Sequence, residues 1–407
     1  MIRSMTNALE FEIHHRLDGA LARTGTITTP HGTIQTPAFI PVATRAAMRG
    51  ITTEQLAGTG AQAALVNAYH LYLRPGHNLI DRAGGIHTFM NWQGPTFSDS
   101  GGFQVMSLGV GFKKVIDMTG DRAENVTHKK EKLAWIDDDG VRFKSHLDGS
   151  MHTFTPELSM QIQHGIGADI TFAFDELTTL HHDYYYQIES LDKRTHPWAV
   201  RSLAEHQRLN AERSHRPPQA LFGVVQGADH EDLRRKSAKF LGEMDFDGYG
   251  LGGALRKENI GDIVRWMNEE LPDDKPRHML GISEPDDIFA CIENGADTFD
   301  CVSPARVARN GAMYTRRGRI NITRAQYKDD FTPFDADCDC YSCEHYTSAY
   351  IHHLFNADEL LSKTLATIHN ERFIVRLVDD IRASIADGTF FEFKNKFLTE
   401  YYGDRSQ

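Results

Sequence analysis

The residues of this chain whose types and spacing could carry out chemistry are concentrated between residues 298 and 311. Asp300 lies within an apolar run that suits a short buried strand, and Pro304 marks its end because proline cannot donate to a sheet ladder. Arg306 and Arg309 follow, three residues apart. A carboxylate at the exit of a strand, beside paired guanidinium groups, is typical of a nucleophile next to a bound phosphate chain. The alternative is a strand-end aspartate that forms a salt bridge with a nearby arginine.

A second group of reactive side chains is a cluster of three cysteines, Cys338, Cys340 and Cys343, among the five in the chain. The odd total and the clustering oppose a disulfide framework and favour a metal site. Three thiolates and one imidazole would close a tetrahedral zinc site with no open position, which is typical of a structural rather than a catalytic zinc. The alternative is three buried cysteines without a function. Spacing alone does not choose the fourth ligand among His345, His352, His353 and His369.

The elements that must position these groups are eight short apolar runs, most of them separated by helical patterns. Most are continuously apolar rather than alternating, which favours parallel strands buried on both faces. Eight such strands predict an α/β protein with a (β/α)₈ TIM barrel. The runs are residues 38–42, 63–67, 96–99, 170–175, 220–226, 248–252, 278–282 and 298–302.

Polar residues or paired glycines end six of the eight predicted strands. In (β/α)₈ barrels the chemistry lies at the C-terminal ends of the strands, so these residues are candidates for one active site. A capping role would explain any one of them, but it does not readily explain six together. The six strand ends carry Asn67, Asp99, Asp175, Gln226, Gly252-Gly253 and Asp300.

Two glycine pairs and two polar side chains are typical of a pocket for a flat base. The pairs at 101–102 and 252–253 let the backbone approach a ligand closely, and Phe103 could stack on a heterocycle. The carboxylate of Asp175 can accept hydrogen bonds from adjacent N–H groups, and the amide of Gln226 can donate to a carbonyl oxygen. Together they suit a purine with a 2-amino and a 6-oxo group. The alternative is a polar network that holds loops together.

Two long segments interrupt the alternation of strands and helices and define the expected domains. Residues 109–150 are charged, and the charged runs at 129–132 and 137–140 indicate a solvated face or a hairpin turn. Residues 141–154 alternate well enough for a β-hairpin arm. We expect a barrel over most of 1–325 with this insertion. A zinc-binding subdomain is expected over 326–371, and a C-terminal helical segment that packs on the barrel over 372–407.

The overall composition is that of an ordinary soluble protein, with 40% hydrophobic and 25% charged residues. No apolar run approaches the ~20 residues needed to span a bilayer, and the N-terminus has no signal-peptide core, so a cytoplasmic protein is expected. The net charge of −12 argues weakly against a large nucleic-acid surface. A local basic patch is still expected, because six arginines fall within nineteen residues: Arg306, Arg309, Arg316, Arg317, Arg319 and Arg324.

Several long segments match, in order, the motifs of a known family. On these segments the chain resembles the tRNA-guanine transglycosylases, also called queuine tRNA-ribosyltransferases, of bacterial type, from the first barrel strands to about residue 385. The matching segments are 67–76, 97–104, 174–176, 225–227, 252–253, 299–302 with the two arginines that follow, and 338–343 with 368–370.

The resemblance implies an enzyme that exchanges the wobble guanine of tRNA for a 7-deazaguanine. Asp300 would attack the anomeric carbon of the ribose and expel guanine, and Asp99 would be the general acid/base. Two displacements at one carbon would retain its configuration, as in a retaining glycosidase. The target base would have to leave its stack to reach such a pocket.

The resemblance also implies roles for other residues. Arg306 and Arg309 would hold anticodon nucleotides, and His369 would be the fourth ligand of a structural zinc ion. A homodimer is expected on the same grounds. The base would be bound by Asp175, Gln226, Gly252, Gly253, Phe103 and Asn67.

Departures from the family pattern leave the incoming base open. Phe103 replaces a tyrosine, Leu177 replaces a cysteine, and residues 254–256 differ in the loop expected to border the 7-substituent. The base could be 7-aminomethyl-7-deazaguanine, queuine or another 7-deazaguanine. Two other functions remain open: a related base-exchange enzyme acting on DNA or on another tRNA position, and a non-catalytic partner subunit, although such a subunit should have lost Asp99 and Asp300. A zinc-dependent hydrolase does not fit a closed zinc site.

Overall fold

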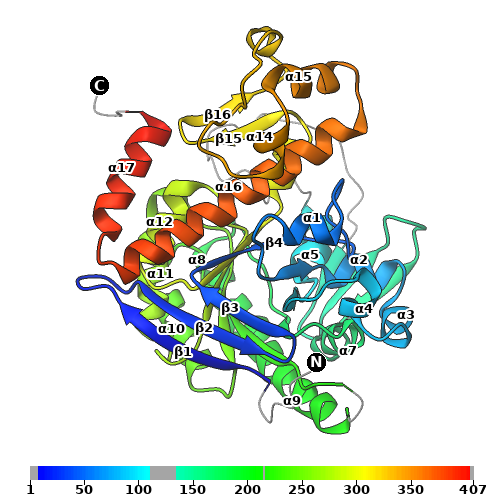
Figure 1. The fold of residues 1–407 in the computed structure, drawn as a ribbon. Coiled ribbons are helices and arrows are strands. Elements are labelled where there is room, and N and C mark those ends of the chain that lie inside the picture. Colours follow the sequence, from blue (N-terminus) through cyan, green and yellow to red (C-terminus); the bar gives the residue numbers. More distant parts are fainter. Residues whose placement is uncertain (1–7, 111–133, 214–215, 404–407) are drawn as a thin grey trace.

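The centre of the protein is a parallel eight-stranded sheet curled into a barrel (Figure 1). The computed structural model describes residues 8–110, 134–213 and 216–403. Around the barrel the order is β4, β14, β13, β12, β11, β10, β6 and β5, and a parallel bridge between Val42 and Leu65 joins β5 back to β4. The predicted (β/α)₈ barrel is therefore confirmed. The strands are β4 (Ala38–Pro41), β5 (Ala64–Val66), β6 (Thr96–Ser98), β10 (Ile170–Phe172), β11 (Ala220–Val225), β12 (Gly248–Leu251), β13 (Arg277–Leu280) and β14 (Thr298–Cys301).

Helices connect the strands and cover the outside of the barrel. The first begins at Thr52, whose hydroxyl accepts from the backbone N–H of Gln55 at 3.2 Å while the Gln55 side chain accepts from the N–H of Thr52 at 2.9 Å. This capping box satisfies two helix-end donors and makes Thr52 the N-cap of α1. The connecting helices are α1 (Thr53–Ala57), α2 (Ala68–Leu73), α3 (His77–Arg82), α4 (Ile86–Met90), α5 (Gly102–Val110), α7 (Pro156–Ile166), α8 (Tyr184–Ser190), α9 (His196–Glu212), α10 (Glu231–Gly242), α11 (Ile260–Asn268), α12 (Pro285–Glu293) and α13 (Ser303–Ala308).

An antiparallel N-terminal sheet closes the end of the barrel where the strands begin. It consists of β1 (Glu10–Arg16), β2 (Arg23–Thr29) and β3 (Gly32–Thr36). Ile27 and Ile34 are fully buried and belong to one apolar cluster with Phe222 of the barrel interior. Substrates must therefore reach the barrel from its other end.

The predicted arm is present between β6 and β10. Strands β8 (Val141–Lys144) and β9 (Met151–Phe154) form the expected hairpin, and β7 (Ala134–Ile136), which was not expected, adds a third strand. The indole Nε1 of Trp198 donates to the carbonyl of Asp138 at 2.8 Å and fixes the β7–β8 turn to α9. The charged run at 129–132 lies outside the described residues.

The C-terminal part forms a lobe above the barrel (Figure 1). It contains β15 (Ala312–Thr315), β16 (Gly318–Asn321), α14 (Tyr341–His345) and α15 (Ser348–Asn356). The long helix α16 (Leu360–Ala386) runs from this lobe across β4, and α17 (Phe390–Tyr402) follows it. Because one helix crosses residue 371 without a break, the expected division at that residue stays a prediction. Among the described residues, no helix is long and apolar enough to cross a bilayer.

Candidate active site

The candidate residues gather at the open end of the barrel because they follow the C-terminal ends of neighbouring parallel strands. Asn67 follows β5, Asp99 follows β6, Asp175 lies beyond β10 and Gln226 follows β11. The glycine pair 252–253 follows β12, and Asp300 is the residue before the last in β14. The contacts between these residues, described below, show that the structure brings the predicted set together.

Asp99 is held by donors from the next strand of the barrel. The backbone N–H of Ala68 donates to Oδ1 at 2.7 Å, and the amide of Asn67 donates to Oδ2. Burial raises the pKa of Asp99 to about 7, and the neighbouring charge of Asp300 acts in the same direction, while the Ala68 hydrogen bond opposes the rise. A carboxyl group whose pKa lies near 7 can both take up and release a proton at neutral pH, as a general acid/base must.

Asp300 is oriented by a buried histidine that the sequence did not single out. His278 on β13 contacts Asp300 Oδ1 through Nε2 at 3.1 Å and the hydroxyl of Thr298 through Nδ1 at 2.8 Å. An ionised carboxylate only accepts hydrogen bonds, so Nε2 carries the hydrogen and Nδ1 accepts from Thr298. The backbone N–H of Gly281 is a more distant donor at 3.4 Å. Within the described part of the chain no arginine forms an ion pair with Asp300, so the salt-bridge alternative is not observed.

Asp175 and Gln226 contact each other directly. The Gln226 Nε2 donates to Asp175 Oδ2 at 2.6 Å, while the buried Oε1 of Gln226 has no hydrogen-bond partner. Burial raises the pKa of Asp175 to about 6, against the Gln226 hydrogen bond, which lowers it. An amide nitrogen has two hydrogens, so the second remains available for the carbonyl oxygen of a bound base. The network alternative and the base-binding prediction are therefore compatible in this pair.

Each glycine pair contains a position where a side chain would collide with a group of the predicted base pocket. A Cβ at Gly253, where φ is +106°, would lie 2.7 Å from Gln226 Oε1, and a Cβ at Gly102 would lie 3.0 Å from the carbonyl of Asp175. Side chains at these positions would push aside the groups predicted to read the base. Phe103 follows at the start of α5, next to this glycine pair, and is 36% exposed.

A buried arginine beneath the base pocket is a second residue that sequence reasoning missed. Arg234 on α10 is fully buried and donates through Nε to Ala228 and through Nη1 to Gly252 at 2.7 Å each, and to Val225 at 3.1 Å. These carbonyls belong to the ends of β11 and β12, so the guanidinium ties together the backbone that carries Gln226 and the glycine pair. Burial lowers the pKa of Arg234 to about 9. No sequence pattern distinguished it from a surface helix arginine.

The predicted RNA-binding arginines lie on the short helix after β14. Arg306 is exposed, and Arg309 is half-buried and donates to the carbonyl of Ala305 at 3.0 Å. Neither forms an ion pair with any described residue. Burial lowers the pKa of Arg309, and repulsion from Arg49 and Arg306 acts in the same direction. The helix therefore presents uncompensated positive charge beside Asp300.

The cysteine cluster is arranged as a metal site, and His369 is its fourth member. The Nδ1 of His369 lies 3.4 Å from the Sγ of Cys338, 3.5 Å from that of Cys340 and 3.4 Å from that of Cys343. A tetrahedral zinc ion with ordinary bond lengths separates sulfur and nitrogen ligands by about 3.6 Å, so these residues fit it. The Nε2 of His369 donates to the carbonyl of Tyr314 at 2.6 Å, which leaves the Nδ1 lone pair directed at the thiols.

The residue after His369 connects this cluster to α13, the helix that carries Arg306 and Arg309. The buried Asn370 accepts from the N–H of Tyr314 at 3.0 Å and donates to the carbonyls of Ala312 at 3.0 Å and Pro304 at 3.1 Å. Pro304 is in the first turn of α13. The position of the arginine helix is thus coupled through α16 to the metal site.

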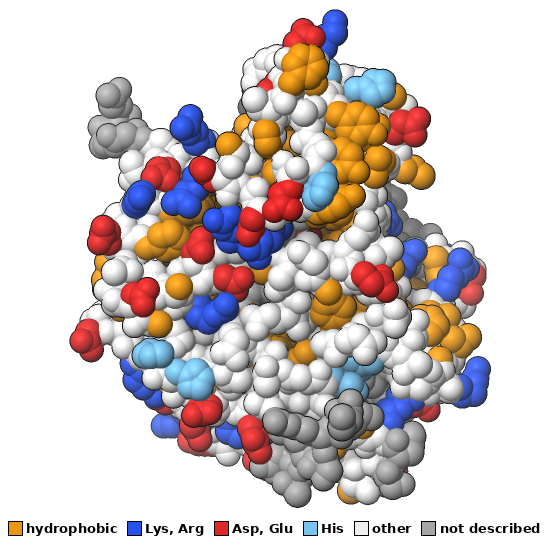
Figure 2. Space-filling view, viewed as in Figure 1, with side chains coloured by type: hydrophobic (Ala, Val, Ile, Leu, Met, Phe, Trp, Pro, Cys, Tyr) orange, Lys and Arg blue, Asp and Glu red, His pale blue; other side chains and the backbone are white. Residues whose placement is uncertain are grey.

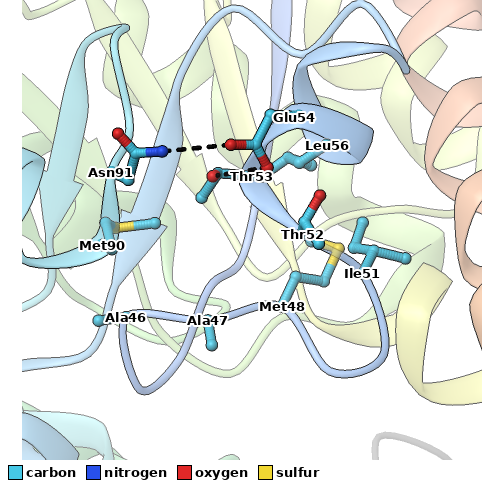
Figure 3. A pocket seen from close by; sticks show the side chains of 10 residues that line it. All are labelled: Ala46, Ala47, Met48, Ile51, Thr52, Thr53, Glu54, Leu56, Met90 and Asn91. Atoms are coloured by element: carbon cyan, nitrogen blue, oxygen red, sulfur yellow. Dashed lines mark hydrogen bonds between the residues drawn. The ribbon is translucent and has the colours of Figure 1, made fainter.

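A separate pocket of about 330 Å³ lies beside the loop from Ala46 to Thr53 (Figure 3). Its lining includes Glu54, which accepts from the Asn91 amide at 3.2 Å, and it contains none of the predicted site residues. It is therefore not the base pocket.

Two of the residues that depart from the family pattern have defined contacts. Leu177 donates through its backbone N–H to the sulfur of Met106. Arg256 donates to Asp229 at 2.8 Å and is 56% exposed.

The chain is similar to known proteins of one family over nearly its whole length. The family model described as queuine tRNA-ribosyltransferase matches residues 18–403. The chain is 42% identical over 403 residues to the queuine tRNA-ribosyltransferase of Caldanaerobacter subterraneus, covering 98% of this chain and 100% of the relative. It is 46% identical over 401 residues to that of Roseiflexus sp., covering 96% and 99%. A putative queuine tRNA-ribosyltransferase of Archaeoglobus fulgidus is 44% identical over 411 residues, covering 96% and 99%.

Proposed function

The chain belongs to the queuine tRNA-ribosyltransferase family, and we propose that it exchanges the wobble guanine of tRNA for a 7-deazaguanine. The incoming base is 7-aminomethyl-7-deazaguanine or queuine, and the reaction is one step of queuosine modification. The observation that carries the proposal is the pair of carboxyl groups at the barrel mouth. His278 contacts the carboxylate of Asp300. Asp99 has a pKa of about 7, and it lies close enough to Asp300 for that charge to raise its pKa.

The two carboxyl groups have different roles because their surroundings differ. Asp300 is oriented by a histidine donor at one oxygen, which leaves the other oxygen free to attack the anomeric carbon. The ribose–guanine bond breaks as Asp99 donates a proton to the leaving guanine, and a ribosyl ester of Asp300 forms. Asp99 then takes a proton from the incoming base, whose nitrogen attacks the same carbon and releases Asp300. Two inversions at one carbon give overall retention.

The base is selected by the edge it presents to β10 and β11. Asp175 accepts from N–H groups on one side of the ring, and the free N–H of Gln226 donates to the 6-oxo group. Gly252 and Gly253 provide close backbone contact, and Phe103 stacks on the ring. Adenine, which has an amino group at position 6, would set a donor against a donor at Gln226.

The cluster of three cysteines and one histidine suits a structural rather than a catalytic metal ion. Cys338, Cys340, Cys343 and His369 would hold Zn²⁺ with all four positions filled by the protein, so the ion would supply folding energy rather than a reactive water. Its contribution to the reaction would be indirect, through the position of α13.

A homodimer in the cytoplasm is the proposed state of the enzyme. Hydrophobic side chains gather on the C-terminal lobe over α14 and α15 (Figure 2). Tyr341 is 49% exposed, Tyr350 is 40% exposed, and Tyr346 stacks on Tyr350 with ring centroids 5.5 Å apart. Aromatic side chains of this kind are enriched at protein interfaces. Sedimentation of the wild type and of Tyr350→Asp would test the dimer, and a wild-type monomer at micromolar concentration would refute it.

The function is tested by incorporation of radiolabelled guanine into unmodified tRNA with a wobble guanine. Label should enter this tRNA and not the same tRNA with a wobble adenine. A chase with each 7-deazaguanine separately identifies the physiological base by its release of the label. A denaturing gel run without an incoming base should show an enzyme–RNA adduct that Asp300→Asn lacks. If folded, zinc-loaded protein incorporates no label into this tRNA, the proposal is wrong.

A further inference from the structure

The loop between β4 and α1 lies at the C-terminal end of the barrel strands, beside β14, which carries Asp300, and β5, which Asn67 follows. On one side β4 pairs with β14, where Pro41 is the register partner of Cys301, and on the other it bridges to β5. The carbonyl of Thr44 accepts from the backbone N–H of Asn67 at 3.2 Å. The loop is therefore bonded directly to the residue that holds Asp99, and it lies beside the strand that carries Asp300.

The same loop is fixed by apolar packing and by a second hydrogen bond. Met48, which is 5% exposed, shares one apolar cluster with Ala68 of α2 and Ala305 of α13. At the far end, the hydroxyl of Thr364 on α16 donates to the carbonyl of Gly50 at 2.5 Å. Met48 and its neighbours also line the pocket beside the loop (Figure 3). A loop held at both ends and in the middle presents its exposed side chains in a fixed arrangement.

Two exposed arginines, Arg45 and Arg49, lie on this fixed loop. Across residues 8–110, 134–213 and 216–403, neither forms an ion pair or a hydrogen bond. Most helix arginines elsewhere are paired: Arg208, for example, contacts Glu205 at 2.7 Å and Glu212 at 2.6 Å. In a chain of net charge −12, unpaired guanidinium groups at one edge of the active site form a local concentration of positive charge.

The positive charges on neighbouring elements are close enough to repel one another. Arg49 and Arg306 both lower the pKa of Arg309, after burial. On the other side, burial lowers the pKa of His70 to about 4, with further lowering by Arg45, His146 and Arg49. Arg49 is therefore at the centre of a row of basic side chains. The row runs from α13, over the β4–α1 loop, to α2 and the hairpin arm. A row of like charges without counter-ions is stabilised by a polyanion.

We propose that Arg45 and Arg49 bind the phosphodiester backbone of the RNA substrate, continuing the site of Arg306 and Arg309 around the rim of the barrel. The inference rests on the proposed function, because it takes RNA as the substrate. The strand crosses the β4–α1 loop while the target base descends between Asp99 and Asp300. The two arginines contribute to RNA affinity without touching the base or the reacting carbon.

The test is the salt dependence of RNA binding. An unmodified anticodon stem–loop RNA with a wobble guanine is titrated with the zinc-loaded enzyme between 0.05 and 1 M salt. For single-stranded nucleic acid each lost phosphate contact reduces the slope of log K against log salt by about 0.7. Arg45→Gln/Arg49→Gln should lower the slope by about 1.4, which corresponds to roughly 25-fold weaker binding at 0.1 M salt if the affinities converge at 1 M.

Controls separate phosphate contact from general charge and from misfolding. Arg208→Gln/Arg265→Gln removes the same charge from arginines paired to acids and should leave the slope unchanged. Arg45→Lys/Arg49→Lys should restore most of the wild-type slope, and kcat at saturating RNA and the KM for free guanine should stay at wild-type values in the glutamine variant. If the slope is unchanged in a glutamine variant that still exchanges guanine, the inference about Arg45 and Arg49 is wrong and the proposed function stands. A wild type that neither binds RNA nor exchanges guanine would instead refute the proposed function.

Discussion

The hydrogen bond from Asn67 to Asp99 offers a sharp test of the acid/base assignment. Asn67 has two roles, because its Oδ1 caps α2 by accepting from the N–H of His70 at 3.0 Å while its amide donates to Asp99 Oδ2. In Asn67→Ser the hydroxyl can still cap the helix, but it is too short to replace the amide donor. The variant therefore removes one donor from the Asp99 carboxylate and leaves the fold intact.

The size of the effect follows from the charge of the acceptor. A hydrogen bond to an ionised group contributes about 1.5–3 kcal/mol, and 1.36 kcal/mol corresponds to one pKa unit, so the pKa of Asp99 should rise by about one to two units. The wild-type group, with a pKa of about 7, is about half ionised at pH 7. In the variant about 1–10% is ionised, so base exchange at pH 7 should fall roughly 5- to 50-fold and recover towards pH 9.

The assay is kcat/KM for guanine exchange between pH 5.5 and 9.5 in both proteins. The rising limb should move to higher pH in Asn67→Ser. Asp183→Ser, which alters the N-cap of α8 where Asp183 accepts from Tyr186 at 2.8 Å, serves as the control for cap substitution and should not move it. A uniform loss of activity at every pH, with the same midpoint, would refute the role of Asp99 as the titrating base.

Three further predictions concern the nucleophile, the base pocket and the metal site. Asp300→Ala should abolish exchange while RNA affinity, measured by filter binding, stays within about twofold of wild type; normal turnover would remove Asp300 from the mechanism. Because the pKa of Asp175 is raised to about 6, its carboxylate becomes protonated as pH falls through 6, and calorimetry should show guanine affinity falling there. Asp175→Asn should bind guanine weakly at all pH values. If the guanine affinity of this variant still changed with pH, another group would be the one that titrates. Cys343→Ser should lose the metal, detected by elemental analysis, and lower the melting temperature; metal content equal to wild type would contradict the ligand assignment.

The strands and their polar ends could be predicted from the sequence because burial and position in a barrel leave local signals. A parallel strand covered on both faces must be apolar throughout, so Asp99, Asp175, Gln226 and Asp300 are conspicuous where each run ends. The hairpin arm was predictable from alternation. Strand β7 is only three residues long, which is too short for a recognisable alternation.

The supporting residues could not be predicted because their partners are distant in the sequence. His278 reaches Asp300 only because β13 and β14 are adjacent in the barrel, and Arg234 is distinguished by the carbonyls that surround it rather than by its neighbours in the chain. Arg45 and Arg49 become recognisable as part of a basic rim only when the fold is known, because α13 and α2 lie on either side of their loop. For the metal, C-x-C-x₂-C predicted the thiols, but the spacing left four histidines open until the family resemblance indicated His369.

Helix α16 determines what can be removed from this protein or exchanged with a relative. One continuous element packs on β4 of the barrel, carries the histidine of the metal cluster and fixes the first turn of α13 through Asn370. The C-terminal lobe is therefore not a detachable module, since cutting the chain before Leu360 would also strip β4 of its outer cover. A chimera with a relative would have to exchange the lobe, α16 and the β4–α1 loop together to keep the proposed RNA-binding rim and the barrel wall in register.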